Sequence, residues 1–281
     1  MIPRRQFLAA AAAALPAFAK PTFKAEVGIN IYSLRYEAGK DLPKTLALIR
    51  ELGFRKVEVG NLYDRTPAEF LGLLKSNGLV ATSMGAAYKA LNADIGPIAA
   101  QANALGVSYV VCDTIPHSAK HIVAKDVISA ADSLNRWGEA LAASGLSLCY
   151  HTHGTEFDPS PDGTHFDTLL KLTNPKFVNY EMDIFWIVYG FQDPVKFLRR
   201  YPNRFPLMHI KDIKKGTKLG LTPADVAEDD SVPLGTGIVN VEAALLAAQD
   251  TGVKHFYLEE EAVDAVPQIR QSLQYLKTLR S

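Results

Sequence analysis

The sequence has few cysteines and no excess charge of either sign. Only two of its 281 residues are cysteines, Cys112 and Cys149, and both lie in apolar, strand-like runs. Such thiols are usually buried and free, and two cysteines do not suggest a disulfide framework. The 30 basic and 30 acidic residues cancel, so there is no electrostatic sign of binding to nucleic acid or an anionic membrane. We therefore expect no nucleic-acid partner.

The sequence also lacks a glycine-rich phosphate loop after its first strand-like run. Residues 28–33 read Gly-Ile-Asn-Ile-Tyr-Ser, which matches neither the GxGxxG nor the Walker pattern. No linker, low-complexity tract or block of like charge divides the chain. These absences favour a single domain and count against an open, doubly wound nucleotide-binding sheet, which stays the alternative architecture.

The first 19 residues have the features of an export signal. Arg4 and Arg5 precede an alanine-rich apolar stretch that ends in Ala17-Phe18-Ala19. Basic residues, a short apolar segment and a small-x-small cleavage site make up a signal peptide, and paired arginines resemble the twin-arginine type. The stretch is short for a membrane span. We expect cleavage after Ala19, a periplasmic or otherwise exported protein, and no membrane anchor after cleavage.

Strand-like and amphipathic runs alternate along residues 24–281, the predicted domain. We expect strands at 26–33, 56–60, 79–85, 108–113, 146–151, 178–184, 205–211 and 255–260. Helices are expected at 41–52, 66–77, 92–105, 119–144, 164–173, 193–201, 239–251 and 263–279. This alternation predicts an α/β protein with a (β/α)₈ TIM barrel. The longest irregular segment, residues 214–239, is expected to form a lid or a substrate wall at the barrel mouth.

Polar residues stand at the ends of several predicted strands, where the side chains of a barrel converge on one mouth. Asp183, His209 and Glu259 each end a different strand. A shared metal ion would explain carboxylates and an imidazole there, and these ligand types suit Mn²⁺, Mg²⁺, Co²⁺ or Zn²⁺. The alternatives are a helix cap for Asp183, a core position for His209, and a capping role for the acidic residues at Glu259.

Four segments resemble the signatures of one protein family. They are Tyr-His-Thr-His-Gly-Thr-Glu-Phe at 150–157, Glu-Met-Asp-Ile-Phe-Trp at 181–186, Met-His-Ile-Lys-Asp at 208–212 and Leu-Glu-Glu-Glu at 258–261. Together they look like the sugar phosphate isomerase/epimerase family, a group of xylose-isomerase-like TIM barrels, over residues 24–279. The resemblance implies one divalent metal ion held by a glutamate, an aspartate, a histidine and a second glutamate.

The last three of these ligands fall on Asp183, His209 and Glu259, and the first is where the sequence departs from the family. Many members carry that glutamate inside the fifth strand, where this chain has Cys149-Tyr150-His151. Glu156, in the following loop, is the expected replacement. His151 and His153 are the alternatives for this fourth position.

The resemblance also implies a reaction, namely proton abstraction next to a carbonyl of a keto-sugar or sugar derivative, giving isomerisation or epimerisation. Export argues that the sugar is unphosphorylated. Glu156 and Glu259 are the predicted proton-transfer groups, while His151 and His153 position the substrate or protonate a leaving group. In the latter case the enzyme is a lyase or dehydratase acting on a keto-sugar or 3-keto-glycoside. A non-catalytic, exported sugar-binding barrel is a second alternative.

The remaining site predictions concern substrate contacts. Lys211 is expected to donate to a substrate oxygen, unless it is a solvated surface lysine. Trp186 is expected to form an apolar wall against the sugar ring, unless it is a core aromatic. The predicted substrate-binding residues are Asn30, Tyr32, Glu58, Trp186 and Asp212. The sequence leaves the oligomeric state open.

Overall fold

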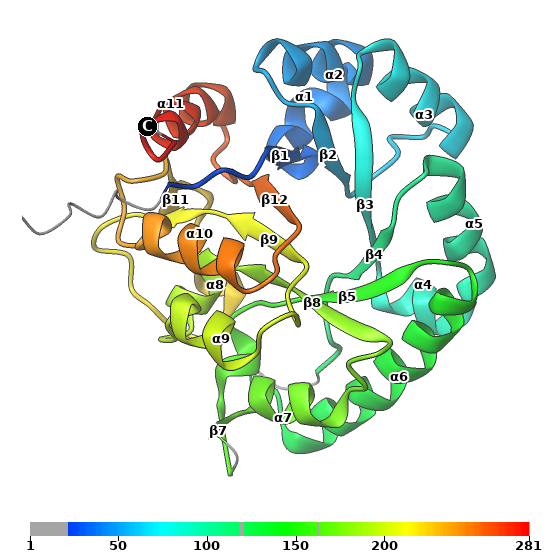
Figure 1. Cartoon of the computed structure of the whole chain (residues 1–281), viewed down its shortest axis with the longest axis vertical. Coiled ribbons are helices and arrows are strands. Elements are labelled where there is room, and N and C mark those ends of the chain that lie inside the picture. Colours follow the sequence, from blue (N-terminus) through cyan, green and yellow to red (C-terminus); the bar gives the residue numbers. More distant parts are fainter. Residues whose placement is uncertain (1–21, 118–120, 162, 281) are drawn as a thin grey trace, which may run out of the picture.

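The computed structural model describes residues 22–117, 121–161 and 163–280 and shows a closed barrel of parallel strands (Figure 1). Around the barrel the strand order is β1-β12-β9-β8-β5-β4-β3-β2. Their bounds are β1 Val27–Asn30, β2 Lys56–Val59, β3 Val80–Ala86, β4 Tyr109–Cys112, β5 Ser147–His151, β8 Val178–Asp183, β9 Leu207–Ile210 and β12 His255–Leu258. The predicted TIM barrel is confirmed. The predicted signal peptide lies outside the described residues.

Helices form an outer layer around these strands in Figure 1. The predicted ones are α2 Leu42–Glu51, α3 Pro67–Ser76, α5 Ile95–Leu105, α6 Ala124–Ala143, α7 His165–Leu172, α9 Pro194–Arg200, α10 Val241–Asp250 and α11 Ala265–Thr278. Three short helices were not predicted: α1 Arg35–Lys40, α4 Tyr88–Ala93 and α8 Ile184–Tyr189. Within the described ranges, no helix combines the length and apolar character needed to cross a membrane.

Capping side chains and glycines explain where several helices begin and end. At the start of α3, the Thr66 side chain accepts from the N–H of Glu69, and the Glu69 carboxylate accepts from the N–H of Thr66. This reciprocal pair satisfies two N–H groups that have no partner inside the helix. At the end of α5, Gly106 adopts a left-handed conformation with φ of 74°, which a residue without a side chain takes at little cost.

Alternation along the strands separates an apolar barrel interior from a polar mouth. Tyr109, Val111, Cys149, Leu207 and Tyr257 form a buried apolar cluster, distinct from the larger core that the helices share with the strands. Both cysteines are buried and free, as expected. Because side chains on one face of a strand recur every second residue, the next inward positions on three of these strands are His151, His209 and Glu259.

The segment 214–239 does contribute a wall at this mouth. A small antiparallel pair joins β10 Asp212–Ile213, just before the segment, to β11 Ser231–Val232 within it, and short 3₁₀ turns, Pro223–Asp225 and Glu228–Asp230, lie between them. A second small pair, β6 Pro159–Ser160 with β7 Gly163–Thr164, precedes α7. The Glu228 carboxylate accepts hydrogen bonds from Arg35 and Tyr36, which hold the segment to α1.

Candidate metal centre and substrate pocket

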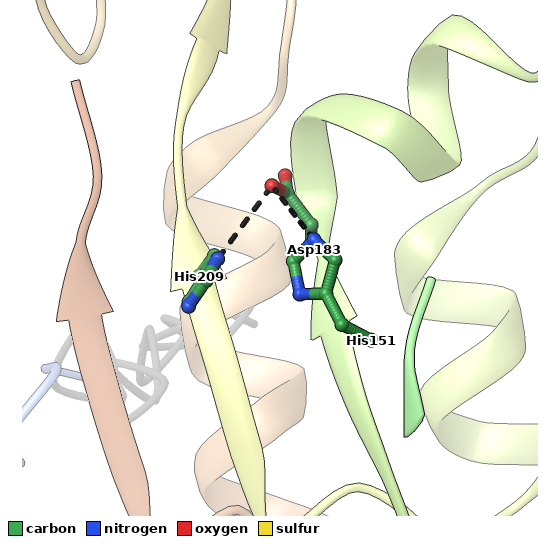
Figure 2. A group of neighbouring side chains, drawn as sticks. All are labelled: His151, Asp183 and His209. Atoms are coloured by element: carbon green, nitrogen blue, oxygen red, sulfur yellow. Dashed lines mark ion pairs between the residues drawn. The ribbon is translucent and has the colours of Figure 1, made fainter. Parts of the chain in front are cut away.

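Three buried side chains from different strands face one another at the carboxyl end of the barrel (Figure 2). They are His151 at the end of β5, Asp183 at the end of β8 and His209 in β9. Nδ1 of His209 lies 3.8 Å from Oδ2 of Asp183, and Nε2 of His151 lies 3.9 Å from the same oxygen. Strand register explains the meeting, since Asp183 pairs with His209.

Two of these ligand atoms have ionic neighbours but no hydrogen bond. Oδ2 of Asp183 and Nδ1 of His209 are buried, and neither makes a hydrogen bond within the described part of the chain; their neighbours are Nζ of Lys211 at 3.4 Å and Oε2 of Glu259 at 3.0 Å. Buried polar atoms are nearly always hydrogen-bonded, so both atoms have capacity for a further partner. A carboxylate and two imidazoles are suitable ligands for a divalent cation, and the residues therefore fit a metal ion.

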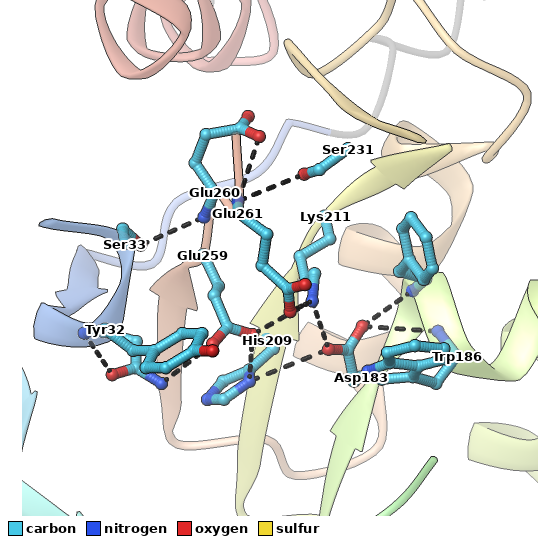
Figure 3. Close-up of polar contacts among 12 residues, drawn as sticks. Tyr32, Ser33, Asp183, Trp186, His209, Lys211, Ser231, Glu259, Glu260 and Glu261 are labelled. Carbon is cyan, nitrogen blue, oxygen red and sulfur yellow. Dashed lines mark hydrogen bonds and ion pairs between the residues drawn. The ribbon is translucent and has the colours of Figure 1, made fainter. Parts of the chain in front are cut away.

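Glu259 and Lys211 complete this cluster (Figure 3). Oε2 of Glu259 lies 3.0 Å from Nδ1 of His209 and 3.3 Å from Nζ of Lys211. Burial alone would raise the pKa of Glu259, but the positive charges of Lys211 and His209 outweigh burial and hold the pKa well below its usual range. Glu259 is therefore an ionised carboxylate within reach of the predicted ligands.

Lys211 is buried among carboxylates and not solvated, because only 1% of its side chain is exposed. Nζ lies 3.4 Å from Oδ2 of Asp183 and 2.5 Å from Oε1 of Glu261. Burial alone would lower the pKa of Lys211, but the nearby carboxylates, led by Asp183, hold it well above the usual value. Lys211 is not among the described residues that line the pocket. Its ammonium group contacts the candidate ligand carboxylates Asp183 and Glu259, and its donation to substrate stays a prediction.

Asp183 uses its two oxygens differently. Oδ1 accepts from the N–H groups of Phe185, at 2.8 Å, and Trp186, at 3.4 Å, and so caps the start of α8. Oδ2 faces the imidazoles. The capping role considered for this residue is thus real, and it coexists with a ligand position because a carboxylate has two oxygens. The cap also fixes the Trp186 backbone next to the cluster.

A second layer of polar groups lies behind the imidazoles. Oε1 of Glu58 is 2.6 Å from Nε2 of His209, and Oε2 of Glu181 is 3.0 Å from Nδ1 of His151. Asn30 Nδ2 donates to Glu58 and to Glu259, at 3.1 and 3.2 Å. Burial and the charge of Glu58 raise the pKa of Glu181 well above normal. The buried carboxylates and imidazoles therefore form one connected network.

The two cluster histidines have opposite electrostatic environments. Burial, with the charges of His153 and His209 next in size, lowers the pKa of His151 well below its usual value. Burial also acts to lower the pKa of His209, but the carboxylates around it, led by Glu181 and Glu259, raise it well above that value. The charges that face the two imidazoles thus shift their pKa values in opposite directions.

A cavity of about 620 Å³ opens over the cluster. Its lining includes three aromatic residues, Tyr32, Tyr63 and Trp186, and two residues of the segment 214–239, Pro223 and Val226. His153 lines the same cavity, its ring 5.6 Å from that of Trp186. This volume lies in the range of small-molecule sites. The cavity therefore joins the candidate metal centre to a space for a small ligand.

Comparison with protein-family models shows to which family the chain belongs. Residues 46–279 match the model described as a xylose isomerase-like TIM barrel. The chain belongs to this family.

Individual members of the xylose isomerase-like family are distant from this chain. An inosose dehydratase from Geobacillus kaustophilus (strain HTA426) is 26% identical over 193 residues, which is 61% of this chain and 62% of the relative. A sugar phosphate isomerase/epimerase from Parabacteroides distasonis ATCC 8503 superposes with a TM-score of 0.71 at 24% identity, over 92% of this chain and 97% of that one. The IolI protein, whose crystal structure has a binding zinc atom, gives 0.72 at 15% identity, over 92% and 98%. At such identities the structures show a shared fold.

Two predicted site residues of this family member lie elsewhere than expected. The Glu156 carboxylate accepts from the hydroxyl of Tyr150 and from the N–H of His153, and it is not among the described residues lining the cavity. The structure places His151, the alternative, with Asp183 and His209, whereas the ligand role of Glu156 stays a prediction. The loop after β5 turns back on its own strand.

Asp212 is the second such residue, because its carboxylate accepts hydrogen bonds from the backbone. It accepts from the N–H groups of Ile213, Gly235, Gly237 and Val239, at 2.8 to 3.0 Å. The predicted substrate-binding residue therefore anchors the segment 214–239. Asn30, Tyr32, Glu58 and Trp186 do line the cavity.

Two residues of the site were missed in the sequence. Glu181 lies two residues before Asp183 on the same strand, so period-two alternation points both side chains inward and could have identified it. Glu261 lines the cavity beside Lys211, but it follows the end of β12, where the sequence gives no comparable signal.

Proposed function

We propose that this protein is a divalent-metal-dependent enzyme that removes a proton next to a carbonyl group of a carbohydrate. The observation that supports it is the convergence of His151, Asp183, His209 and Glu259 beneath a cavity, where two of the ligand atoms make no hydrogen bond within the described chain. These four residues would hold the ion. When bound, a divalent cation supplies a Lewis acid that polarises the carbonyl and offsets the developing negative charge.

The donor set also bears on the metal. Two imidazoles and two carboxylates favour Zn²⁺, Co²⁺ or Mn²⁺ over Mg²⁺, which takes oxygen ligands and water. The zinc atom of the structurally similar IolI protein is consistent with this choice. We therefore propose one ion of the Zn²⁺, Co²⁺ or Mn²⁺ class per chain.

Glu259 is the proposed base. Its carboxylate is ionised and lines the cavity, and Oε1 would receive the proton from the substrate carbon. Asn30 donates to Oε1 and orients the carboxylate. Lys211 keeps its proton and holds Oε2, so that the base remains fixed in one rotamer. Trp186 forms the apolar wall that we expect against the sugar ring.

Elimination is the outcome that the site supports best. His153 lines the cavity between Trp186 and His151, with ring separations of 5.6 and 4.6 Å. Glu259 would take the proton on the carbon beside the carbonyl, the C–O bond on the next carbon would break, and a proton from the His153 ring would pass to the leaving oxygen. The products would be an unsaturated keto-sugar and water or an alcohol. The inosose dehydratases among the relatives support a lyase.

Isomerisation or epimerisation is the second candidate, since it begins with the same proton abstraction. A second group must then return a proton, and Glu156 does not line the cavity in the described structure. Glu261 does, with a quarter of its side chain exposed and Lys211 as its partner. Glu261 is therefore the carboxylate that would take the role first assigned to Glu156.

We further propose that the substrate is unphosphorylated and that the protein is exported by the twin-arginine route. Phosphate sites usually present arginine or lysine. Among the described residues that line the cavity there is neither. A neutral sugar or glycoside suits this lining, and the signal-like residues 1–19 suit export.

The test is a deuterium-exchange assay on metal-loaded protein. Keto-sugars, inososes and 3-keto-glycosides would be incubated in D₂O and followed by NMR. Loss of the proton beside the carbonyl together with release of water or an alcohol supports the lyase. Deuterium in a recovered isomer supports the isomerase or epimerase. Binding without exchange across the whole panel would overturn the enzyme proposal in favour of a sugar-binding barrel.

A further inference from the structure

We propose that Glu58 and Glu181 are positioning residues that keep the N–H of each cluster imidazole on the side away from the ligand atoms. They would be neither metal ligands nor substrate contacts. This inference rests on the metal centre proposed above. Both carboxylates are almost completely buried, with exposed fractions of 4% for Glu58 and 1% for Glu181.

His209 shows the arrangement most clearly, because its two ring nitrogens face different partners. Nε2 is 2.6 Å from Oε1 of Glu58, whereas Nδ1 faces oxygens of two proposed ligands, Oε2 of Glu259 at 3.0 Å and Oδ2 of Asp183 at 3.8 Å. A cation held by Asp183 and Glu259 would need the lone pair of His209 on Nδ1, because a histidine ligand binds metal through an unprotonated nitrogen. The hydrogen then belongs on Nε2, where an oxygen of Glu58 can accept it.

His151 repeats the arrangement with its nitrogens exchanged. Nδ1 is 3.0 Å from Oε2 of Glu181, and Nε2 faces Oδ2 of Asp183 at 3.9 Å. The two rings therefore present different nitrogens to the same aspartate oxygen. In each case the opposite nitrogen meets a buried glutamate. One imidazole meets its glutamate through Nε2 and the other through Nδ1. This difference indicates that each glutamate selects the tautomer of the histidine it contacts.

Glu58 is itself held in place from outside the cluster. The Ser83 hydroxyl donates to Oε2 at 2.6 Å, and Asn30 Nδ2 donates to Oε1 at 3.1 Å. Ser83 is in turn 2.9 Å from the Tyr257 hydroxyl. Glu181 is placed by strand register, which pairs it with His151. Both carboxylates are therefore fixed before any ligand arrives, as positioning residues must be.

A second cation between Glu58, Glu181 and His209 is the rival explanation. One ligand atom from each of these residues also lies within 4.8 Å of the others, and Oε1 of Glu181 has no hydrogen-bond partner in the described residues. Distance decides between the two. Ligand atoms about 2.1 Å from one cation are separated by about 3 Å or more. The 2.6 Å between Glu58 and His209 is the length of a charge-assisted hydrogen bond.

The experiment compares glutamine with alanine at both positions. Zn²⁺ and Co²⁺ affinity and stoichiometry would be measured on the full chain by chelator competition, together with the Co²⁺ absorption spectrum. Wild type should bind one ion. Glu58→Gln and Glu181→Gln, whose amide oxygens still accept from the imidazole, should stay within about threefold of wild type, whereas each alanine variant should bind about 10- to 100-fold more weakly with a shifted Co²⁺ spectrum.

A control separates these effects from a general loss of stability. Asp167→Ala removes another buried carboxylate, which accepts from the N–H of Thr164 at the start of α7 and from the Tyr201 hydroxyl. It should lower the unfolding temperature without changing metal affinity or the Co²⁺ spectrum. A thermal unfolding curve of each metal-free variant would show whether that variant folds. If the alanine variants do not fold, the metal affinity of the glutamine variants still tests the proposal.

Three results would overturn the inference. Two ions in wild type, with one lost in the glutamine and alanine variants alike, would show a second cation. Glutamine variants that bind the metal as weakly as the alanine variants would show that the charge of the glutamate matters and not its hydrogen bond. An unchanged metal affinity with a raised KM would show that Glu58 or Glu181 contacts the substrate. If wild type binds one ion and the predicted pattern holds but no sugar reacts, the proposed function fails alone; if wild type binds neither ion, both fail.

Discussion

Nζ of Lys211 lies 3.4 Å from Oδ2 of Asp183, in a region closed to solvent. The ammonium group also contacts Glu259 and Glu261. Its positive charge thus offsets carboxylates that would otherwise repel one another in a low-dielectric interior. A buried charge that loses its partner is strongly destabilising, so the lysine supports the cluster even where it touches no substrate.

Replacing this lysine should destabilise the protein. For Lys211→Met we expect a loss of about 3 to 5 kcal/mol in the free energy of unfolding of the metal-free protein, because buried carboxylates lose their counter-charge. Urea unfolding at neutral pH would measure it. Lys214→Met is the matched control, since that exposed lysine pairs with the exposed Asp229 and should change stability by less than about 0.5 kcal/mol. Equal stability of the two variants would contradict the prediction.

Two helix-capping aspartates allow a clean test of the metal centre. Asp183 and Asp193 each accept N–H groups through Oδ1 at the start of a helix. Only the former has its second oxygen in the cluster. Wild type and Asp193→Asn should be stabilised by about 2.7 kcal/mol at a Zn²⁺ concentration 100 times Kd, whereas Asp183→Asn should gain almost nothing. Thermal unfolding with and without Zn²⁺ measures this, and equal metal responses in both variants would exclude Asp183 as a ligand.

Glu156 and Glu259 should respond differently to the same change. Glu156→Gln keeps an acceptor oxygen for the His153 N–H, and its NH₂ group can donate to the Tyr150 hydroxyl oxygen. We therefore expect unchanged metal stoichiometry and kcat within about tenfold of wild type, well short of the loss typical for a proton-transfer group. Glu259→Gln should lose both metal affinity and turnover. Chelator competition and steady-state kinetics would show this. A Glu156→Gln variant without metal would restore the interpretation drawn from the sequence.

The contact between Glu228 and α1 should make the segment 214–239 sensitive to acid. Hydrogen bonds from Tyr36 and then Arg35 lower the pKa of Glu228. A carboxyl group with a lowered pKa in the folded state stabilises it above the normal glutamate pKa, and this contribution disappears as pH falls through the lowered value. Hydrogen exchange in the segment should therefore rise in that acidic window in wild type.

The matched variant for this prediction is Glu228→Gln, which should show faster exchange in the segment already at neutral pH and no further change in the acidic window. Asp229→Asn, whose partner is the exposed Lys214, should behave like wild type. Identical pH profiles for wild type and Glu228→Gln would show that the contact does not hold the segment.

The barrel was predictable from the sequence because strands and helices carry different apolar periods and glycines separate them. Gly53, Gly106 and Gly252, for example, have positive φ where a helix was expected to end. Helix α8 was missed because all six of its residues, Ile-Phe-Trp-Ile-Val-Tyr, are apolar and show no amphipathic period. Its start depends on the Asp183 cap, which the sequence permits but does not require.

The ligand positions were predictable only where a strand fixes them. Asp183, His209 and Glu259 were expected together because each ends a barrel strand, and the structure brings them together. Glu156 lies in a loop, and the direction of a loop side chain depends on contacts such as the Tyr150 hydroxyl that no local pattern encodes. Strand geometry, in contrast, already pointed His151 into the mouth.

Asp212 ties the C-terminal end of the segment 214–239 to the point where the segment begins, just beyond the strand that carries His209. Gly237 is needed at this junction, because a Cβ there would lie 2.1 Å from the carbonyl oxygen of Ile213. With both ends held near Asp212, the intervening stretch can be exchanged, lengthened or shortened during evolution while the floor of the cavity keeps its shape. Under the proposed function, new substrate preferences can then arise through the portion around Pro223 and Val226 without a change in the residues underneath.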